Sequence, residues 1–300
     1  MAHYIVTYSS ALVHKGKSNK TERIYEYLFG EVVTVIEEGS EWMLVHTPFK
    51  DVDGWIQAEY ITPITDKQYN DYCSDVKMRV ECSSLFVKKV NSYDTLLVPT
   101  SAVLPFYNFM TNTFLIADSE YEILSPMYWD PNITDIRTRV YRAAMCYLNA
   151  PFVRNRRSVD GIDDVNLIAN ALSVVSERVP HSIEELASFG TFLSFIEEAQ
   201  LGDILLFSNS SSGEVSHCGM YLGNGNVLHT SGKVRIDRVD HQGIFNPTLK
   251  RYSFQLASIL SIIGREPTVR FLKPSESTTC SIIKPPHPRK ENHGAIRACA

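Results

Sequence analysis

The chain has 300 residues, of which 44% are hydrophobic and 21% charged, so it is long enough to bury a substantial core and to form two or three domains. Its formal net charge of −5 argues against sequence-independent binding to nucleic acid, because such binding needs a basic surface. No segment reaches the roughly 20 consecutive apolar residues that a membrane-spanning helix requires. We therefore expect a soluble globular protein with no nucleic-acid partner and no membrane span.

The N-terminus, MAHYIVTYSS, has no basic segment followed by a long apolar run, which predicts a cytoplasmic protein without a secretory signal. The cysteines form no Cys-x-x-Cys pairs, which disfavours a structural zinc site and a disulfide framework. We predict buried thiols, no metal and no cofactor. The six cysteines are Cys73, Cys82, Cys146, Cys218, Cys280 and Cys299.

Residues 1–64 carry short runs of Val, Ile, Tyr and Trp separated by turn residues, a pattern typical of β-strands. The clearest unit is a hairpin over residues 30–47, with its turn at residues 38–40. A Gly-Trp step, a strand and a closing proline follow in residues 53–64. Taken alone, Trp42 and Trp55 are expected to fill the core of a small barrel.

Residues 65–128 again alternate short apolar runs with Ser, Asn, Asp and Pro, which predicts a second small β-barrel on a looser pattern. From residue 129 the apolar spacing becomes helical, with Asn132 and Asp135 at the expected helix start. A second helix is expected near Asp163, followed by a strand-rich half, and this order predicts an α+β domain over residues 129–267. Residues 268–300 have no periodicity and are expected to form a flexible tail.

Four stretches of the third domain stand out: YLNAPFVRNRRSVDGIDD, VPHSIEELASFG, AQLGDILLF and SHCGMYLGNGNVLHTSGKVRID. On these stretches the domain resembles the NlpC/P60 family of cysteine peptidases, which cut bacterial cell-wall peptides, and the N-terminal order of turns and tryptophans is similar to a bacterial SH3-like module. The resemblance implies an α+β, papain-like NlpC/P60 domain preceded by one or two small SH3-like β-barrels.

In that family a cysteine at the start of a helix attacks the amide, a histidine acts as base, and a third polar residue orients the base. A helix N-terminus lowers the pKa of such a thiol and makes it a better nucleophile. In this sequence His217 and His229 match the base and the orienting residue. The nucleophile position holds Asp164, and Val165 and Asn166 replace the family's Ser and Gly.

The departures extend beyond the nucleophile. The family's Pro-Tyr-x-Trp-Gly-Gly motif becomes PFVRNR, so Phe152 stands in place of a tyrosine hydroxyl. The Asp-Ser pair that resembles a clamp for a substrate's free amine falls around Ser182 and Ile183, without a carboxylate. The residues expected to line the cleft are Phe152, Asp163, Val165, Ser182 and Ser216.

Three arginines also lie close to this cleft in the sequence, at positions 154, 156 and 157. They would favour an acidic ligand if they face the groove. A solvated loop is the commoner state of such a run, because arginine is mostly exposed. The sequence leaves both readings open.

Asp164 is a poor nucleophile for an amide, because it would have to form a mixed anhydride while expelling an amine. It has a structural role to offer instead, since aspartate at a helix N-terminus accepts backbone N–H bonds. Cys218 follows His217 on a predicted strand, so its side chain should point to the opposite face and pack inward. Cys146 is expected within a helix among apolar neighbours.

The preferred interpretation is a catalytically inactive protein that binds a peptide, a muropeptide-like fragment or a protein partner through the vestigial cleft and the SH3-like domains. The alternative is an active γ-D-glutamyl-diamino acid endopeptidase with an unrecognised nucleophile. A third class is a scaffold that uses only its barrels and tail. A divalent-metal cluster of Asp163, Asp164, His217 and His229 is a further alternative to a hydrogen-bonded remnant, although no ligand-spacing motif supports it.

Overall fold

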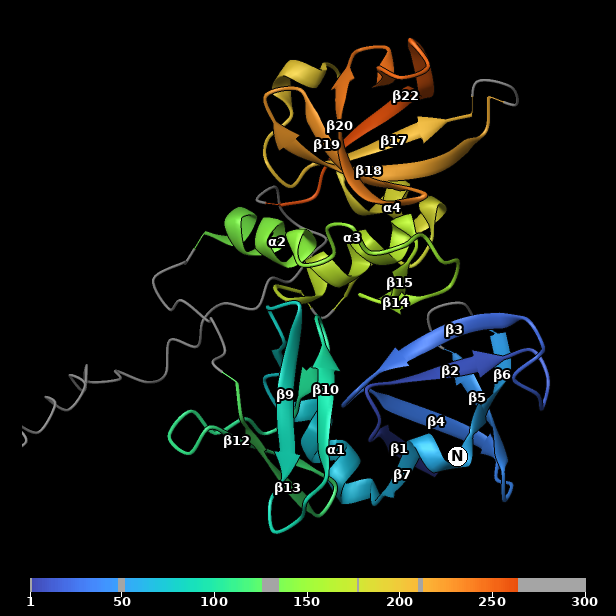
Figure 1. The fold of residues 1–300 in the computed structure, drawn as a ribbon, viewed down its shortest axis with the longest axis vertical. Coiled ribbons are helices and arrows are strands. Elements are labelled where there is room, and N and C mark those ends of the chain that lie inside the picture. Colours follow the sequence, from blue (N-terminus) through green and yellow to red (C-terminus); the bar gives the residue numbers. More distant parts are fainter. Residues whose placement is uncertain (1, 48–51, 126–134, 177, 210–212, 264–300) are drawn as a thin grey trace, which may run out of the picture.

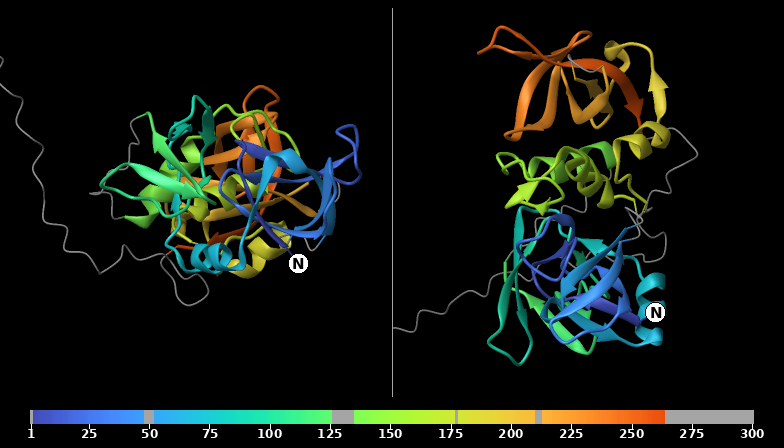
Figure 2. Two further views of the ribbon diagram at one scale, coloured as in Figure 1. Left: turned by 90° about the horizontal axis from the view of Figure 1, so that it is seen from below. Right: turned by 90° about the vertical axis from the view of Figure 1, so that its right-hand side faces the viewer.

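The computed structural model describes residues 2–47, 52–125, 135–176, 178–209 and 213–263. Two β-rich units lie at one end of the molecule, a layer of helices lies across them, and a second large sheet lies on the far side of that layer (Figure 1). The side view in Figure 2 shows the same order of layers. No described helix is long and apolar enough to cross a bilayer.

The first unit is a curled seven-stranded antiparallel sheet in the order β3-β2-β6-β5-β4-β1-β7. The predicted hairpin is confirmed, because β4 pairs with β5 around the turn near residue 39. Trp42 and Trp55 are half-buried rather than core residues, and the Lys17 ammonium lies 3.9 Å from the centre of the Trp55 ring. The strands are β1 Ala2–Val6, β2 Ser10–His14, β3 Arg23–Leu28, β4 Val32–Glu37, β5 Trp42–Thr47, β6 Val52–Gln57 and β7 Ile61–Ile64.

The second unit begins with helix α1, Asp66–Ser74, which a capping box of Thr65 and Gln68 starts. Its strands form a four-stranded sheet, β10-β9-β13-β12, and a separate two-stranded pair, β11-β8. Its core also contains Ile5, Leu28 and Phe29 of the first unit, so the two β units share one hydrophobic cluster. The division at residue 64 stays a prediction. The strands are β8 Met78–Arg79, β9 Ser84–Lys89, β10 Thr95–Pro99, β11 Val103–Leu104, β12 Thr113–Ile116 and β13 Ser119–Ile123.

The third unit has the predicted order of helices followed by strands, which makes the molecule a mixed α and β protein. Helix α2, Ile136–Met145, is capped by Asp135, whereas Asn132 lies outside the described residues. Cys146 follows the last residue of α2 rather than lying within it. The remaining helices are α3 Asp164–Ser173 and α4 Ile183–Phe189.

The strands of the third unit close on themselves. Strand β22 pairs with β17 on one side and also with β21, so the six strands β17 to β22 form a closed antiparallel barrel, with β16 added outside. The strands are β14 Arg157–Ser158, β15 Gly161–Ile162, β16 Thr191–Leu193, β17 Ile204–Ser208, β18 Val215–Gly223, β19 Asn226–Ser231, β20 Lys233–Asp240, β21 Gly243–Asn246 and β22 Arg251–Ser261. Closure leaves these six strands without a free edge.

Helix α3 lies between the barrel and α2 and is buried along almost its whole length. Leu167, Ile168 and Leu172 pack with Leu206, Met220 and other buried residues in the main core of the third unit. Burial on all sides explains why its apolar residues are not confined to one stripe. The core therefore fixes both the axis of α3 and the place where it begins.

Candidate functional site

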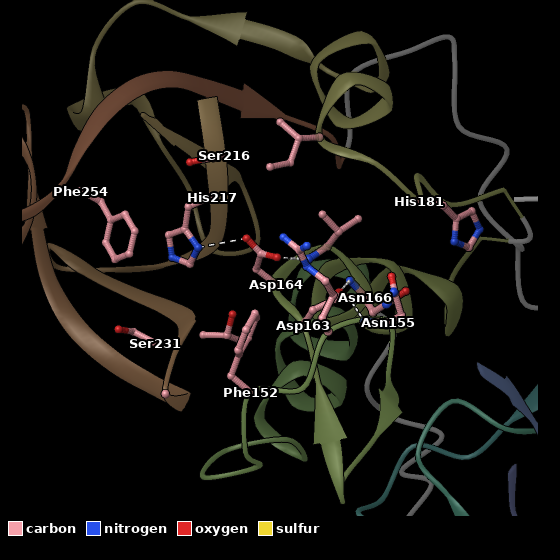
Figure 3. A pocket seen from close by; sticks show the side chains of 15 residues that line it. Phe152, Asn155, Asp163, Asp164, Asn166, His181, Ser216, His217, Ser231 and Phe254 are labelled. Atoms are coloured by element: carbon pink, nitrogen blue, oxygen red, sulfur yellow. Dashed lines mark hydrogen bonds and ion pairs between the residues drawn. The ribbon is translucent and has the colours of Figure 1, made fainter. Parts of the chain in front are cut away.

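A cleft of about 430 Å³ opens where the N-terminus of α3 meets strands β18 and β22 (Figure 3). Its lining combines aromatic rings, hydroxyl groups, two carboxylates, histidines and one arginine. The lining residues are Phe152, Arg154, Asn155, Asp163, Asp164, Val165, Asn166, His181, Ile183, Ser216, His217, Thr230, Ser231, Gly232 and Phe254.

Two adjacent aspartates start α3 and perform different tasks. Asp163 is the N-cap, and its carboxylate accepts hydrogen bonds from the backbone N–H groups of Asn166 and Asn155, each at 2.8 Å. Asp164 is the first helical residue, and its Oδ1 accepts from Val165 N at 3.0 Å. The cap expected of Asp164 is therefore supplied by Asp163, which leaves the second oxygen of Asp164 free to face the strands.

That oxygen begins a row of polar contacts. Asp164 Oδ2 lies 3.0 Å from His217 Nδ1 and also accepts from Cys218 N at 3.2 Å. His217 Nε2 lies 2.9 Å from His229 Nδ1, and His229 Nε2 lies 3.1 Å from Asp237 Oδ2. Arg235 holds the other oxygen of Asp237 at 2.8 Å. The predicted pair of facing histidines is thus the centre of a chain that has a carboxylate at each end.

The direction of the hydrogen bonds in this row follows from the state of His229. A neutral imidazole donates through one nitrogen and accepts through the other. Burial lowers the pKa of His229, which is 1% exposed, and Asp237 opposes that shift only in part. The hydrogen bond from His229 lowers the pKa of Asp237 in turn. His229 therefore stays neutral, with its Nε2–H donated to Asp237 and its Nδ1 accepting from His217 Nε2.

This arrangement has the geometry of a catalytic triad with a carboxylate in place of the nucleophile. In such a triad one nitrogen of the base faces the nucleophile and the other faces the orienting residue; here Nδ1 of His217 faces Asp164 and Nε2 faces His229. The ring of Phe254 stacks on His217 at 4.2 Å between centroids and covers one of its faces. The imidazole is held as part of the wall of the cleft.

The described cysteines do not replace the missing nucleophile. Cys218 is 0% exposed in the hydrophobic core, as predicted, and burial raises the pKa of its thiol well above the ordinary value. Burial also raises the pKa of Cys146 and of Cys82. None of the four cysteines in the described ranges lines the cleft, while Cys280 and Cys299 lie outside those ranges.

The predicted cleft residues Phe152, Val165 and Ser216 line the cavity together with the two aspartates and His217. Ser182 was expected there but does not line it, because its side chain caps α4 by accepting from Glu185 N at 3.1 Å. Sequence reasoning also missed several site residues. Thr230, Ser231 and Asp237 lie in a stretch that carries the family resemblance but were given no role in it, and Phe254 lies outside all of those stretches.

The contacts of the two aspartates and the two histidines do not have the geometry of a divalent-metal site. Among the described residues no group of three or more His, Cys, Asp or Glu side chains is placed to hold a metal ion. Asp163 accepts two backbone N–H bonds at the helix start, while Asp164, His217 and His229 follow one another in a row rather than converging on one point. The hydrogen-bonded reading fits these contacts better.

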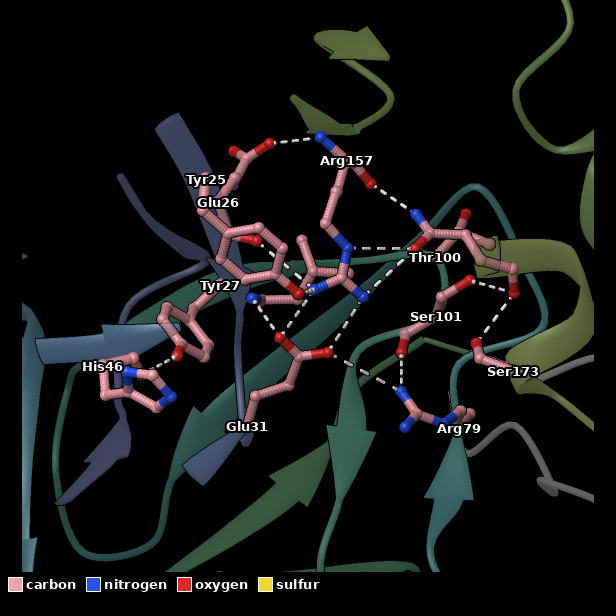
Figure 4. A network of polar contacts seen from close by, with 12 residues as sticks. Tyr25, Glu26, Tyr27, Glu31, His46, Arg79, Thr100, Ser101, Arg157 and Ser173 are labelled. Atoms are coloured by element: carbon pink, nitrogen blue, oxygen red, sulfur yellow. Dashed lines mark hydrogen bonds and ion pairs between the residues drawn. The ribbon is translucent and has the colours of Figure 1, made fainter. Parts of the chain in front are cut away.

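Two of the three arginines in the loop ahead of α3 bind the first β unit. Figure 4 shows the contacts of Arg157. Arg157 is 3% exposed, and its guanidinium binds Glu31 at 3.0 and 3.1 Å and the hydroxyl of Tyr25 at 2.6 Å. Arg156 binds Glu26 at 3.0 Å. Burial alone would lower the pKa of Arg157, but the charge of Glu31 raises it above the ordinary value. Two of the three arginines are therefore structural, and the solvated-loop interpretation is wrong for them.

Comparisons with known proteins identify the kind of domain that contains this cleft. Residues 150–252 match the model of the NlpC/P60 family. A stretch of 110 residues is 31% identical to proteins named as probable endopeptidases from Mycobacterium bovis and Mycobacterium tuberculosis. The match covers 36% of this chain and 27% of those relatives, so the chain spans about a quarter of their length. The chain contains an NlpC/P60 domain.

Solved structures extend the likeness to the whole described fold. A crystal structure of an NlpC/P60 family protein from Bacillus cereus aligns with a TM-score of 0.68 and 17% identity, and covers 88% of this chain and 100% of its own. An NlpC/P60 endopeptidase from Photobacterium damselae aligns with a TM-score of 0.58 and 13% identity, and covers 86% of this chain and 70% of its own. The expected combination of an NlpC/P60 domain with a β-rich N-terminal region is confirmed at the level of fold.

The buried pair of Arg157 and Glu31 yields a first prediction. Arg157→Met should lower the free energy of unfolding by about 3 kcal/mol, because it leaves the buried Glu31 carboxylate with the Leu28 N–H at 3.0 Å and, as a counter-charge among the described residues, Arg79 at 3.8 Å. Urea denaturation measures the loss. The matched control is Arg154→Met at the exposed cleft rim, which should change stability by less than about 0.5 kcal/mol. Equal losses in the two variants would contradict the role assigned to Arg157.

The lowered pKa of His229 yields a second prediction. Because the unfolded chain protonates this residue more readily, its contribution to stability is complete above about pH 6.5 and is lost as pH falls through the folded pKa. The loss from this one group is at most about 1.4 kcal/mol per pH unit. Urea midpoints between pH 7 and pH 5 should fall less steeply for His229→Gln than for the natural protein. Parallel pH profiles would show that His229 is not the titrating group.

Proposed function

We propose that this protein is a non-catalytic binder of cell-wall peptides that uses the cleft of its NlpC/P60 domain. The observation that carries the proposal is the carboxylate of Asp164, which lies 3.0 Å from His217 Nδ1 at the position where the family resemblance puts the thiol. Among the described residues this site offers no thiol to a substrate, which supports binding rather than cleavage. The family match and the relatives named as endopeptidases support a peptidoglycan-related ligand.

The cleft has the makings of a binding site. Its volume of about 430 Å³ lies within the range of pockets that hold small ligands. Phe152 and Phe254 supply apolar surface, and the hydroxyls of Ser216 and Ser231 supply hydrogen-bonding groups around it. The core packing of α3 and the row of four polar residues hold these walls rigidly, which lowers the entropic cost of binding.

The competing function is hydrolysis by an active γ-D-glutamyl-diamino acid endopeptidase. It needs a thiol within reach of His217, and within the described ranges the cysteine next to His217 in the chain, Cys218, points into the core on the opposite face of β18. Rearrangement of Asp164 would free His217 Nδ1 but would not supply a nucleophile. The binding function therefore requires fewer changes to the observed site.

The proposal is tested with L-Ala-γ-D-Glu-diaminopimelate, scored by mass spectrometry for cleavage and by calorimetry for binding. We expect intact tripeptide and measurable binding. The control is His217→Ala, which opens the wall of the cleft and should weaken binding. Cleavage by the natural protein that disappears in His217→Ala would overturn the proposal in favour of the endopeptidase. If the protein neither cleaves nor binds the tripeptide, the proposal is overturned in favour of a scaffold that acts through its β-rich units.

The vacancy of the nucleophile position can itself be tested by Asp164→Cys. A thiol at this helix start lies beside His217 and should be alkylated by iodoacetamide roughly tenfold faster than an unperturbed cysteine, because the helix N-terminus lowers its pKa. The natural protein should show no labelling at residues 152–254. A matched Val165→Cys variant, one residue further into the helix, should react more slowly. Equal rates for the two variants would mean that the site does not activate a thiol.

A further inference from the structure

We infer that the cleft selects an anionic ligand and that the guanidinium of Arg154 binds a carboxylate of that ligand. The inference deepens the proposed function, because it takes the cleft as a binding site and names the charge it prefers. It does not need the ligand to be a cell-wall peptide. The hydrogen-bonding groups of the lining fall into two sets: those that already have partners within the protein and those that are still available to a ligand.

Each oxygen of the lining carboxylates already accepts at least one hydrogen bond. Both oxygens of Asp163 accept backbone N–H groups, and both oxygens of Asp164 accept from backbone or imidazole. The place where the family resemblance puts a clamp for a free amine is lined here by Ile183, which carries no charge. A cationic ligand group would thus have to share carboxylate oxygens that already hold the start of α3 and His217 in place.

The donors are available. Arg154 is exposed, lines the cleft and forms no ion pair within the described part of the chain, although it has five N–H donors. The two other arginines of the same loop are held by Glu26 and Glu31, whereas Arg154 has no carboxylate partner among the residues that the structure describes. Arginine binds carboxylates through two parallel hydrogen bonds, which gives both charge and geometric selection.

A second polar group points to the same conclusion from inside the wall. Thr230 is 4% exposed and lines the cleft, and its hydroxyl oxygen is buried with no hydrogen-bond partner among the described residues. A buried hydroxyl without a partner is costly, so such groups are normally satisfied by water or by a ligand. Its O–H is available to donate to an acceptor-rich ligand that enters the cleft.

The probes for the test are N-acetyl-D-glutamate, which has two carboxylates and no amine, and the corresponding diamide, which has neither charge. Both are titrated into the full chain and followed by NMR chemical shifts. We expect the acid to bind more tightly than the diamide, and Arg154→Gln to weaken binding of the acid by about tenfold or more while leaving the diamide unchanged. Arg154→Lys should restore part of the loss, because it keeps the charge but not the two parallel bonds.

The matched control is Arg251→Gln, which removes the same charge from an exposed position outside the lining and should leave both titrations unchanged. Absence of acid binding, equal affinities for the two probes, or acid binding unaffected by Arg154→Gln would each overturn the inference. The tripeptide separates this inference from the proposed function. If the acid binds through Arg154 but the tripeptide does not bind, only the proposed cell-wall ligand is wrong. If the tripeptide binds equally well to the natural protein and to Arg154→Gln, only the inference about Arg154 is wrong.

Discussion

The hydrogen bond between Asp164 and His217 is the contact on which the character of this site depends. It joins the start of a buried helix to a strand of the closed barrel, and it places a carboxylate where the family resemblance puts a thiol. An acceptor at this position changes the role of the whole row. In a peptidase of the family the imidazole would face a thiol, whereas here His217 faces a carboxylate, which is a poor nucleophile for an amide. The row has become a cross-link between helix and barrel.

The aromatic partner of His217 reinforces this reading. Phe254 lies on β22, the strand that closes the barrel by pairing with both β17 and β21, and its ring stacks on the imidazole. The stacked pair covers apolar surface and limits the access of water to His217. The same ring forms part of the cleft wall, so barrel closure and the surface offered to a ligand depend on a single strand.

The sequence predicted the parts of this architecture that depend on local patterns. The hairpin at residues 30–47, the helix near Asp163 and the inward packing of Cys218 follow from turn residues, capping and strand alternation, and all three are confirmed. The facing of His217 and His229 followed from the family resemblance. The role of Asp237 did not, because a second carboxylate beyond His229 depends on the register of β19 and β20.

The arginine run shows most clearly why the rest was out of reach. Three arginines in a loop are typical of a solvated segment, and the carboxylates near them in the sequence, Asp160 and Asp163, are not the ones that bind Arg156 and Arg157. The partners, Glu26 and Glu31, lie 131 and 126 residues away from Arg157 in the chain. Only the packing of the first β unit against the third brings them together, and that packing has no periodic signal in either segment.

The packing of the arginine loop, residues 154–157, against strand β3 affects both how substitutions act on the cleft and how the molecule can be divided into fragments. Asn155 donates to the backbone of Arg23 at 2.8 Å, and Glu26 accepts from the backbone of Arg157, so strand β3 of the first unit is the floor under the rim of the cleft. The rim therefore belongs to two domains at once. A substitution in β3 would alter the support of the cleft rim without touching a residue of the NlpC/P60 domain, and a fragment that begins after the β-rich units would carry the cleft with that support removed.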